Sequence, residues 1–393
     1  MKITCLIDSL GSGGAQRQLC TLAVLLKKRG MDVSMLTYHP YDFFLPMLQE
    51  AGIEYTCLQS RSMPRRILAI RRALRHGSQD VVLAFLAAPN LFAELAAIPR
   101  RTWGLVVSER NVVSAASNSP LAWRRHFHRI ADYVTTNSHT NRLMIERSVP
   151  AMKGRVITVY NTVDLETFYP VAHADTRDPT DLRIVVAATF RITKNVLGLI
   201  KALAIVNARS RSLRLRVDWY GRLPSERDRV LDRYSYKVVR RLIERHALQD
   251  SVIFHPPVCS IGDIYRGADA VALPSFFEGL PNAVCEAMAC GRPILMTNVC
   301  DAGNLVKNGH NGFLFDPASP EDMARAILEF ASLNVTERET MGRRSREMAE
   351  RMFAPAPFAA RYVEILSAAA ARKRLPIEHW ISDVPDSAYR SLG

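Results

Sequence analysis

The sequence predicts an α/β protein of two similar domains, each built on a parallel sheet that helices cover on both faces. Three observations carry this prediction. The chain has 393 residues, which is long for one hydrophobic core and suits two domains of ordinary size. Short apolar runs alternate with helix-like segments in both halves, as is typical of parallel sheets. A polar stretch at residues 171–181 interrupts the alternation once and has the composition of a linker.

The first domain is expected to span residues 1–170. The apolar run at residues 2–10 predicts a strand, and residues 15–30 predict an amphipathic helix that ends at Gly30. Further buried strands are expected, in order, at the runs DVSMLTY, VVLAFL, TWGLVVSE, DYVTTNS and RVITVYN. Because helix-like segments separate these runs, the strands are expected to be parallel.

The second domain is expected to span residues 182–355. The alternation restarts with a strand at residues 182–189 and a helix at 196–208. Further strands are expected at LRLRVDWYG, SVIFHPP and ADAVALPS, and a further helix at PEDMARAILEFASL. The last segment, residues 356–393, begins with a long helical stretch that no strand follows.

The composition is that of a folded protein with an excess of positive charge. Hydrophobic residues make up 48% of the chain and charged residues 23%, so a disordered chain is excluded. The net charge of +14 leads us to expect anionic partners, such as phosphates, nucleic acid or acidic lipid headgroups. The seven cysteines are scattered and form no C-x-x-C, so neither a zinc site nor a disulfide framework is indicated. A reducing cytosol fits this cysteine pattern.

Neither a signal peptide nor a membrane span is expected. The N-terminal apolar run is too short for a signal peptide and no cleavage site follows it. Residues 81–98 resemble a membrane span, but Pro89, Asn90 and Glu94 interrupt them and their first half has a strand pattern. A buried strand, a turn and a helix are therefore expected there, in a cytoplasmic protein.

A glycine-rich loop, GSGGAQRQ, follows the first predicted strand. Ligands of open parallel sheets bind beyond the carboxyl ends of the strands, and Gly13 and Gly14 would let backbone amides approach a phosphate there. A dinucleotide-binding fingerprint is disfavoured, because Gln16 takes the place of its third glycine. The second strand also ends without the acidic residue that would hold an adenine ribose. An ordinary tight turn is the alternative.

Two cations and two carboxylates lie in loops at the same expected edge of the second domain. Arg191 and Lys194 are three residues apart and suit a diphosphate, although two solvated surface cations are the alternative. Glu278 precedes a helix and Glu286 lies about one and a half turns inside it, where both could accept hydrogen bonds from sugar hydroxyls. The free amides at the start of this helix, near Leu280 and Asn282, would face an anion. A solvated capping carboxylate with a helix salt bridge is the alternative.

The motif EGLPNAVCEAMACGRP, with glutamates eight residues apart, resembles the signature of retaining glycosyltransferases of the GT-B fold, family 4. GGAQRQLCTLA resembles the N-terminal Gly-Gly loop of that family. ADYVTTNSHTNR, VITVYNTVDLETFYP and NGHNGFLFDPASPEDMARAI resemble its mid-chain, interdomain and closing motifs. The resemblance covers nearly the whole chain in the right order. It implies two Rossmann-like domains facing across a cleft, with the C-terminal helix crossing back to the first domain.

The resemblance also implies roles for individual residues. Glu286 would hold the ribose of a nucleotide-sugar, and Glu278 would contact the transferred sugar. Arg191 and Lys194 would neutralise the diphosphate leaving group. The remaining donor-binding positions would be Gly13, Gly14, Gly279, Leu280, Pro281 and Asn282, while acceptor or interdomain contacts would involve Gln16 and Asn161. No metal and no cofactor are expected, since the family is thought to need none and the chain contains no D-x-D.

Some positions depart from the family pattern. Members often space the arginine and lysine five residues apart, so the role of Lys194 is less firmly implied than that of Arg191. Many carry a histidine after the fourth strand of the first domain, where this chain has Ser-Glu-Arg-Asn; Glu109 and Arg110 are therefore the catalytic candidates to test there. Thr162 replaces a usual glycine and Asn304 a common glutamate, which bears on sugar and acceptor preference.

Two basic stretches of the first domain, RSMPRRILAIRRALRH and LAWRRHFHRI, mix arginines with apolar side chains. Such a surface suits the headgroups of an anionic membrane, where a lipid-linked acceptor would be found. The residues expected to contact it are Arg61, Arg65, Arg66, Arg71, Arg72, Trp123, Arg124 and Arg125. A solvated helix face is the alternative. Nucleic acid is not expected, because no nucleic-acid-binding motif is present.

The sequence thus predicts a retaining, metal-independent hexosyltransferase that uses a nucleotide-sugar, UDP-linked by default. Its acceptor would be a saccharide or lipid-linked saccharide in cell-surface polysaccharide or glycolipid synthesis, and the protein would be cytoplasmic or peripheral on the inner face of the cell membrane. Two alternatives stay open. One is a nucleotide-sugar epimerase of the same architecture, for which no acid/base pair can be assigned. The other is a non-catalytic nucleotide-sugar-binding protein, which would use the same donor-binding residues.

Overall fold

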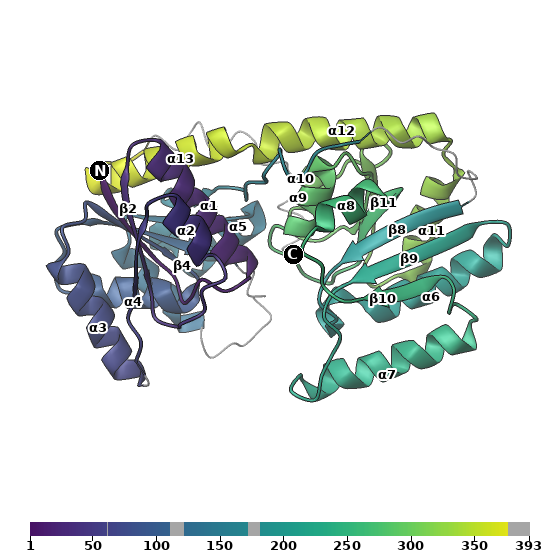
Figure 1. Ribbon diagram of the computed structural model, residues 1–393, viewed down its shortest axis with the longest axis horizontal. Helices are drawn as coiled ribbons and strands as arrows, with labels where there is room; N and C mark the ends of the chain where they lie inside the picture. The colour runs from purple at the N-terminus through teal and green to yellow at the C-terminus, as the bar shows by residue number, and fades with distance from the viewer. Residues whose placement is uncertain (61, 111–121, 172–180, 376–393) are drawn as a thin grey trace. The chain divides into compact units, whose positions relative to one another are not determined.

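The computed structural model describes residues 1–60, 62–110, 122–171 and 181–375 (Figure 1). These residues form two compact units. The first unit comprises Met1–Thr162 and a helix that begins at Pro355, and the second comprises Val163–Ala354. The division falls between Thr162 and Val163, and the domain limits expected from the sequence stay a prediction.

The first unit contains a seven-stranded sheet in which all neighbouring strands are parallel, as predicted. The spatial order is β3-β2-β1-β4-β5-β6-β7. The strands are β1 (Lys2–Leu6), β2 (Asp32–Thr37), β3 (Glu54–Cys57), β4 (Val81–Phe85), β5 (Gly104–Glu109), β6 (Tyr133–Thr136) and β7 (Val156–Thr158). Strand β3 was not predicted, because its four residues contain no apolar run and only alternate between half-buried and exposed positions.

Helices cover both faces of this sheet. The helical segments are α1 (Gly14–Lys28), α2 (Leu45–Glu50), α3 (Met63–His76), α4 (Ala87–Ala97), the 3₁₀ segment η1 (Ala122–Ile130), α5 (His139–Ser148), η2 (Pro150–Met152) and α13 (Pro355–Ala370). One core lies under α1 and α13, and the other lies under α3, α4 and α5. Helix α13 packs on β4, β5 and α1, although more than half of the chain separates it from them (Figure 1). The predicted return of the C-terminal helix to the first domain is therefore confirmed.

The segment 81–98 forms the strand β4 and the helix α4, as expected from its interrupted apolar pattern. Within the described ranges, no helix combines the length and the hydropathy that a bilayer crossing requires.

The second unit contains a six-stranded parallel sheet in the order β10-β9-β8-β11-β12-β13. Its strands are β8 (Asp181–Ala187), β9 (Arg214–Tyr220), β10 (Val252–His255), β11 (Ala270–Leu273), β12 (Ile294–Thr297) and β13 (Gly312–Phe315). Its helical segments are η3 (Ile192–Lys194), α6 (Val196–Arg209), α7 (Val230–Arg245), α8 (Ile261–Arg266), α9 (Asn282–Ala289), α10 (Ala302–Leu305), α11 (Pro320–Ser332) and α12 (Val335–Phe353).

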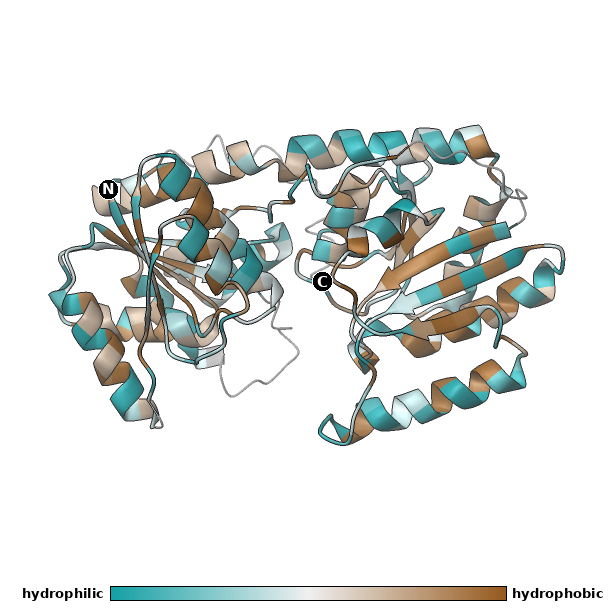
Figure 2. Cartoon of the chain, in the orientation of Figure 1, coloured by the Kyte–Doolittle hydropathy of each residue, from teal (hydrophilic) through white to brown (hydrophobic). Residues whose placement is uncertain are grey.

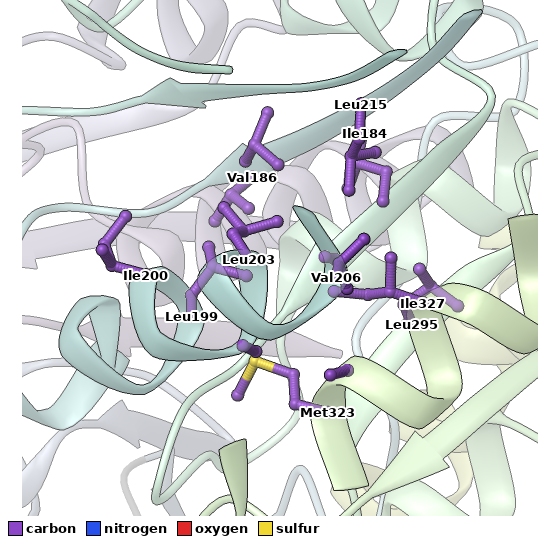
Figure 3. Close-up of a cluster of buried hydrophobic side chains, with 14 of the residues drawn as sticks. Ile184, Val186, Leu199, Ile200, Leu203, Val206, Leu215, Leu295, Met323 and Ile327 are labelled. Atoms are coloured by element: carbon purple, nitrogen blue, oxygen red, sulfur yellow. The ribbon is translucent and has the colours of Figure 1, made fainter. Parts of the chain in front are cut away.

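The hydrophobic core of the second unit explains why helix α6 forms where it was predicted. Leu199, Leu203 and Val206 repeat along one side of α6 and face strand β8 and helix α11 (Figure 3).

Helix α12 was not predicted. Most of its residues are hydrophilic (Figure 2), yet it begins at a capping box of Asn334 and Glu337 and buries a sparse set of apolar residues.

Candidate functional site

The loops that follow β8 and β11 are joined to each other at the carboxyl ends of these neighbouring strands. The backbone amide of Phe276 donates to the carbonyl of Thr193 over 2.9 Å. The ammonium of Lys194 forms a salt bridge with Glu278, with 2.5 Å between Nζ and Oε1. Two of the predicted site residues, one from each loop, are thus in direct contact at the edge of the sheet where ligands of such folds bind.

The loop that carries Arg191 and Lys194 is held on both sides. The carboxylate of Asp232, which is buried at the start of α7, accepts from the backbone amide of Ile192 over 2.9 Å. Asn195 adopts the left-handed conformation and caps α6, because its side chain accepts from the amide of Gly198. Asp232 was not predicted as part of this site, since it lies in the amphipathic helix α7, 40 residues away from the loop it supports.

Helix α9 positions the second carboxylate. It begins at Asn282, with Pro281 as its N-cap. Glu286 is the fifth residue of the helix and is only 8% exposed, whereas Glu278 stays in the half-buried loop before it. The residues between them, Gly279 and Leu280, form the turn that leads into the helix. The two glutamates therefore occupy the loop and helix positions predicted for them.

The glycine-rich loop of the first unit lies at the start of α1. Gly13 is the N-cap, and both Gly13 and Gly14 are exposed. The amide of Gln16 donates to the carboxylate of Asp8 over 2.9 Å, so this side chain is already held by its own unit. Asn161 is buried, 4% exposed, just after β7.

Glu109, at the end of β5, is part of a buried charged network that was not predicted from the sequence. Its carboxylate contacts the guanidinium of Arg125 at 2.9 Å and the Nε2 atom of His128 at 3.0 Å. The Nδ1 atom of the same histidine contacts Glu94 of α4 at 2.6 Å. Because both oxygens of Glu109 are engaged and the residue is 8% exposed, Glu109 holds η1 against the sheet.

The protonation of this network follows from its contacts. Burial lowers the pKa of His128, but hydrogen bonds to Glu109 and Glu94 outweigh that effect and raise it to about 9. Burial raises the pKa of Glu94. For Glu109, burial acts upward as well, but the bonds from His128 and Arg125 hold its pKa below the usual value. His128 is therefore an imidazolium at neutral pH. Pairs of this kind cannot be read from the sequence, because their members come from α4, β5 and η1.

Several residues of the predicted basic surface are buried or bonded within their own unit in the structure. Arg125 is buried against Glu109, which removes it from any membrane-facing surface. Arg66 lies over the ring of Tyr38 and donates to the Ser60 carbonyl, and Arg71 donates to the Leu95 carbonyl. Arg61 lies outside the described residues.

Exposed members of this surface remain on η1 and α3. The exposed residues are Arg65, Leu68, Arg72 and Trp123, while Arg124 is half-buried.

Matches to protein families cover both units. The family model "Glycosyltransferase Family 4" matches residues 12–167, and the model "Glycosyl transferases group 1" matches residues 181–332. Together they contain all the candidate residues of the glycine-rich loop, the cation loop and the two-glutamate motif.

Individual enzymes that resemble this chain share about a quarter of its residues over the aligned part. The D-inositol 3-phosphate glycosyltransferase of Pseudarthrobacter chlorophenolicus is 27% identical over 283 residues, which are 68% of this chain and just under two thirds, 66%, of that enzyme. A Campylobacter jejuni enzyme that adds N-acetyl-D-galactosamine to an undecaprenol-linked saccharide, GalNAc-alpha-(1->4)-GalNAc-alpha-(1->3)-diNAcBac-PP-undecaprenol alpha-1,4-N-acetyl-D-galactosaminyltransferase, is 26% identical, with 80% of this chain and 84% of that enzyme covered.

Solved structures establish the fold. Anabaena Alr3699/HepE in complex with UDP superimposes with a TM-score of 0.79 over 94% of this chain and 100% of that one, at 19% identity. The same Anabaena protein has also been solved with UDP-glucose. At this level of identity the likeness concerns the fold alone.

Proposed function

The chain belongs to glycosyltransferase family 4 and has the GT-B fold, and we propose that it is a retaining hexosyltransferase. The donor is a nucleotide-sugar, UDP-linked by preference, and the acceptor is a saccharide or a lipid-linked saccharide. The contact between Lys194 and Glu278 carries this proposal, because it joins the two loops that the family signature occupies.

The proposed chemistry assigns one task to each charged residue. Arg191 and Lys194 stabilise the negative charge that develops on the diphosphate leaving group, which is the main source of catalysis in such a reaction. Glu286 accepts hydrogen bonds from the ribose hydroxyls. Glu278 accepts from hydroxyls of the transferred sugar, and its salt bridge with Lys194 orients it. Backbone amides at the start of α9, near Leu280 and Asn282, face the diphosphate.

The substrate assignment rests on the relatives. The Anabaena protein binds UDP and UDP-glucose, which favours a UDP-sugar donor. The Campylobacter enzyme acts on an undecaprenol-linked saccharide, which favours an acceptor of that class in cell-surface glycan synthesis. The positive charge supplied by Arg191 and Lys194 takes the place of a metal in this proposal, so EDTA should leave the rate unchanged.

The experiment that tests the function is a thermal-shift panel of UDP-, GDP-, ADP- and dTDP-sugars, with NAD and tRNA as controls. A ligand that binds the folded state adds stability of RT ln(1 + [L]/Kd), so the right donor raises the melting temperature selectively. Turnover of the selected donor with and without EDTA follows, and the anomeric configuration of the product is read by NMR. Interconversion of the donor sugar would indicate the epimerase instead, binding without turnover would indicate a non-catalytic protein, and a response to NAD or RNA alone would overturn the proposal.

Glu286→Ala is expected to weaken UDP binding about tenfold or more, because a hydrogen bond to a charged group contributes about 1.5–3 kcal/mol. Isothermal titration with UDP measures the effect. Glu347→Ala is the matched control, since Glu347 is an exposed glutamate of α12 in the same unit. Equal affinities of wild type and Glu286→Ala would remove this residue from the ribose site.

We further propose that the first unit contacts an anionic membrane through Trp123, Leu68 and Arg72. Trp123 is 52% exposed and Leu68 is 65% exposed, and η1 and α3 pack on the same core of the sheet. Trp123→Ala and Leu68→Ala are each expected to reduce co-sedimentation with vesicles that contain phosphatidylglycerol. Tyr234→Ala serves as the control, because Tyr234 is an exposed aromatic residue of the second unit. Sedimentation that all three variants share with wild type would contradict this surface.

A further inference from the structure

Buried polar atoms without hydrogen-bond partners gather at the carboxyl ends of β5 and β6. Among the described residues these atoms are Ser108 Oγ, both terminal nitrogens of Arg110, Asn137 Oδ1, Asn141 Oδ1 and Arg142 Nε. Folded proteins satisfy nearly all such groups, and each exception calls for a cause. Because this cluster lies at the ligand-binding edge of a parallel sheet, a ligand that supplies the missing partners is the economical cause.

Arg110 is the centre of the cluster. Its side chain is 6% exposed, and its Cζ atom lies 4.6 Å from the centre of the Phe85 ring, so the guanidinium is stacked and held in place. Burial lowers the pKa of Arg110, and the charge interaction and hydrogen bond with the hydroxyl of Tyr362 oppose this effect. A guanidinium keeps its charge at neutral pH all the same.

No carboxylate among the described residues pairs with Arg110. The adjacent one, Glu109, is already shared between Arg125 and His128. A buried positive charge whose two terminal nitrogens have no acceptor is costly, and such a charge persists where an anion comes to meet it.

Asn137 and Asn141 add hydrogen-bond acceptors beside the terminal nitrogens of Arg110, which are donors. The side chain of Asn137 donates to the carbonyl of Arg110, and that of Asn141 donates to the carbonyl of Glu109, each over 3.3 Å. These bonds orient both amides and leave their oxygens without donors. A ligand that satisfies the cluster therefore needs an oxyanion for the guanidinium and hydroxyl groups for the amide oxygens.

We propose that Arg110, Asn137 and Asn141 form a subsite for an acceptor that carries an anionic group beside its hydroxyls. This inference rests on the proposed glycosyl transfer, since it identifies the acceptor class of the same enzyme. The planar fork of an arginine binds phosphate and carboxylate alike. The subsite thus takes a polyol or sugar phosphate or a uronic acid, and Arg110 acts as a binding residue.

The test is isothermal titration of the full chain, in the presence of UDP, with three probes: D-inositol 3-phosphate, neutral myo-inositol and glucuronic acid. Wild type is expected to bind at least one anionic probe at least about tenfold more tightly than myo-inositol. The phosphate and carboxylate arms show which anion the subsite prefers. Arg110→Gln is expected to lose this preference, and Arg110→Lys to retain part of it. Arg129→Gln, an exposed arginine of η1, is the matched control.

The melting temperature and the UDP affinity of Arg110→Gln distinguish a binding role of Arg110 from a structural one. Without ligand, Arg110→Gln is expected to melt at the same temperature as wild type or higher, because it removes an unpaired buried charge; a lower melting temperature would show a structural role and overturn the subsite. Arg110→Gln should still bind UDP. Wild type that does not distinguish anionic from neutral probes would also overturn the subsite. A chain that binds the anionic probe through Arg110 but never binds UDP would contradict the proposed function and leave the subsite standing.

Discussion

His128→Ala is expected to lower the free energy of unfolding by about 3–5 kcal/mol, the usual cost when one member of a buried charge network is removed. The imidazolium lies between two carboxylates, at 2.6 Å from Glu94 and 3.0 Å from Glu109, and is 3% exposed. Without it, Glu94 stays buried with no cation beside it. Thermal and urea denaturation measure the loss. His126→Ala is the control, because His126 is an exposed histidine of the same segment η1.

The same network predicts how stability depends on pH. The pKa of His128 is about 9 in the folded protein, against 6.5 for an ordinary histidine. A pKa raised by folding contributes stability that is complete below pH 6.5 and is lost as the pH rises to 9, in total about 3 kcal/mol. The groups that contact His128 are Glu94 from α4 and Glu109 from β5, and Arg125 from η1 contacts Glu109 in turn. Glu94, whose pKa is raised by burial, adds a loss that begins at more acidic pH.

A second variant, His128→Gln, tests whether the titration of His128 causes this pH dependence. His128→Gln keeps a polar side chain that does not titrate, so its stability should stay level between pH 6.5 and 9 while that of wild type falls. A wild-type profile that His128→Gln reproduces over this range would show that other groups cause the pH dependence.

Local pattern was sufficient to predict the elements that contain long apolar runs. The predicted strands and helices with long apolar runs, such as β4, β5 and α6, formed because their sequences bury apolar side chains on the faces that the sheet requires. Short or polar elements were missed. Strands β3, β12 and β13 have four residues each, and α12 buries few of its nineteen. For these elements, tertiary packing decides a structure that local preference leaves open.

The candidate site divides in the same way. Arg191, Lys194, Glu278 and Glu286 could be predicted as site residues because each lies in a motif just after a strand or at the start of a helix. Asp232 and the His128 network were missed, since each contact joins residues 16 to 40 positions apart. Arg125 was assigned to the surface because arginine is rarely buried, and its burial depends on a partner, Glu109, that composition cannot reveal. The roles proposed for Arg191, Lys194, Glu278 and Glu286 in donor binding and catalysis stay predictions.

Arg191→Ala is expected to lower turnover about 100- to 1,000-fold, the range seen when a preorganised group that stabilises developing negative charge is removed. Within the described residues Arg191 forms no salt bridge and is exposed at the N-cap of η3, whereas the charge of Lys194 is shared with Glu278. Arg191 is therefore the cation that can give its full charge to a leaving diphosphate. Release of UDP from the donor, with water or the identified acceptor, measures the rate.

The division of the effect between kcat and KM decides what Arg191 does. A residue that acts on the developing charge lowers kcat and leaves the affinity for the intact UDP-sugar nearly unchanged, since the charge on the leaving group is complete only after the bond is cleaved. Lys201→Ala is the control, because Lys201 is an exposed lysine of α6 that follows the same loop. A raised KM with an unchanged kcat would make Arg191 a ground-state binding residue. An unchanged rate would transfer the catalytic role to Lys194, whose salt bridge to Glu278 would then have to open or shift toward the diphosphate during the reaction.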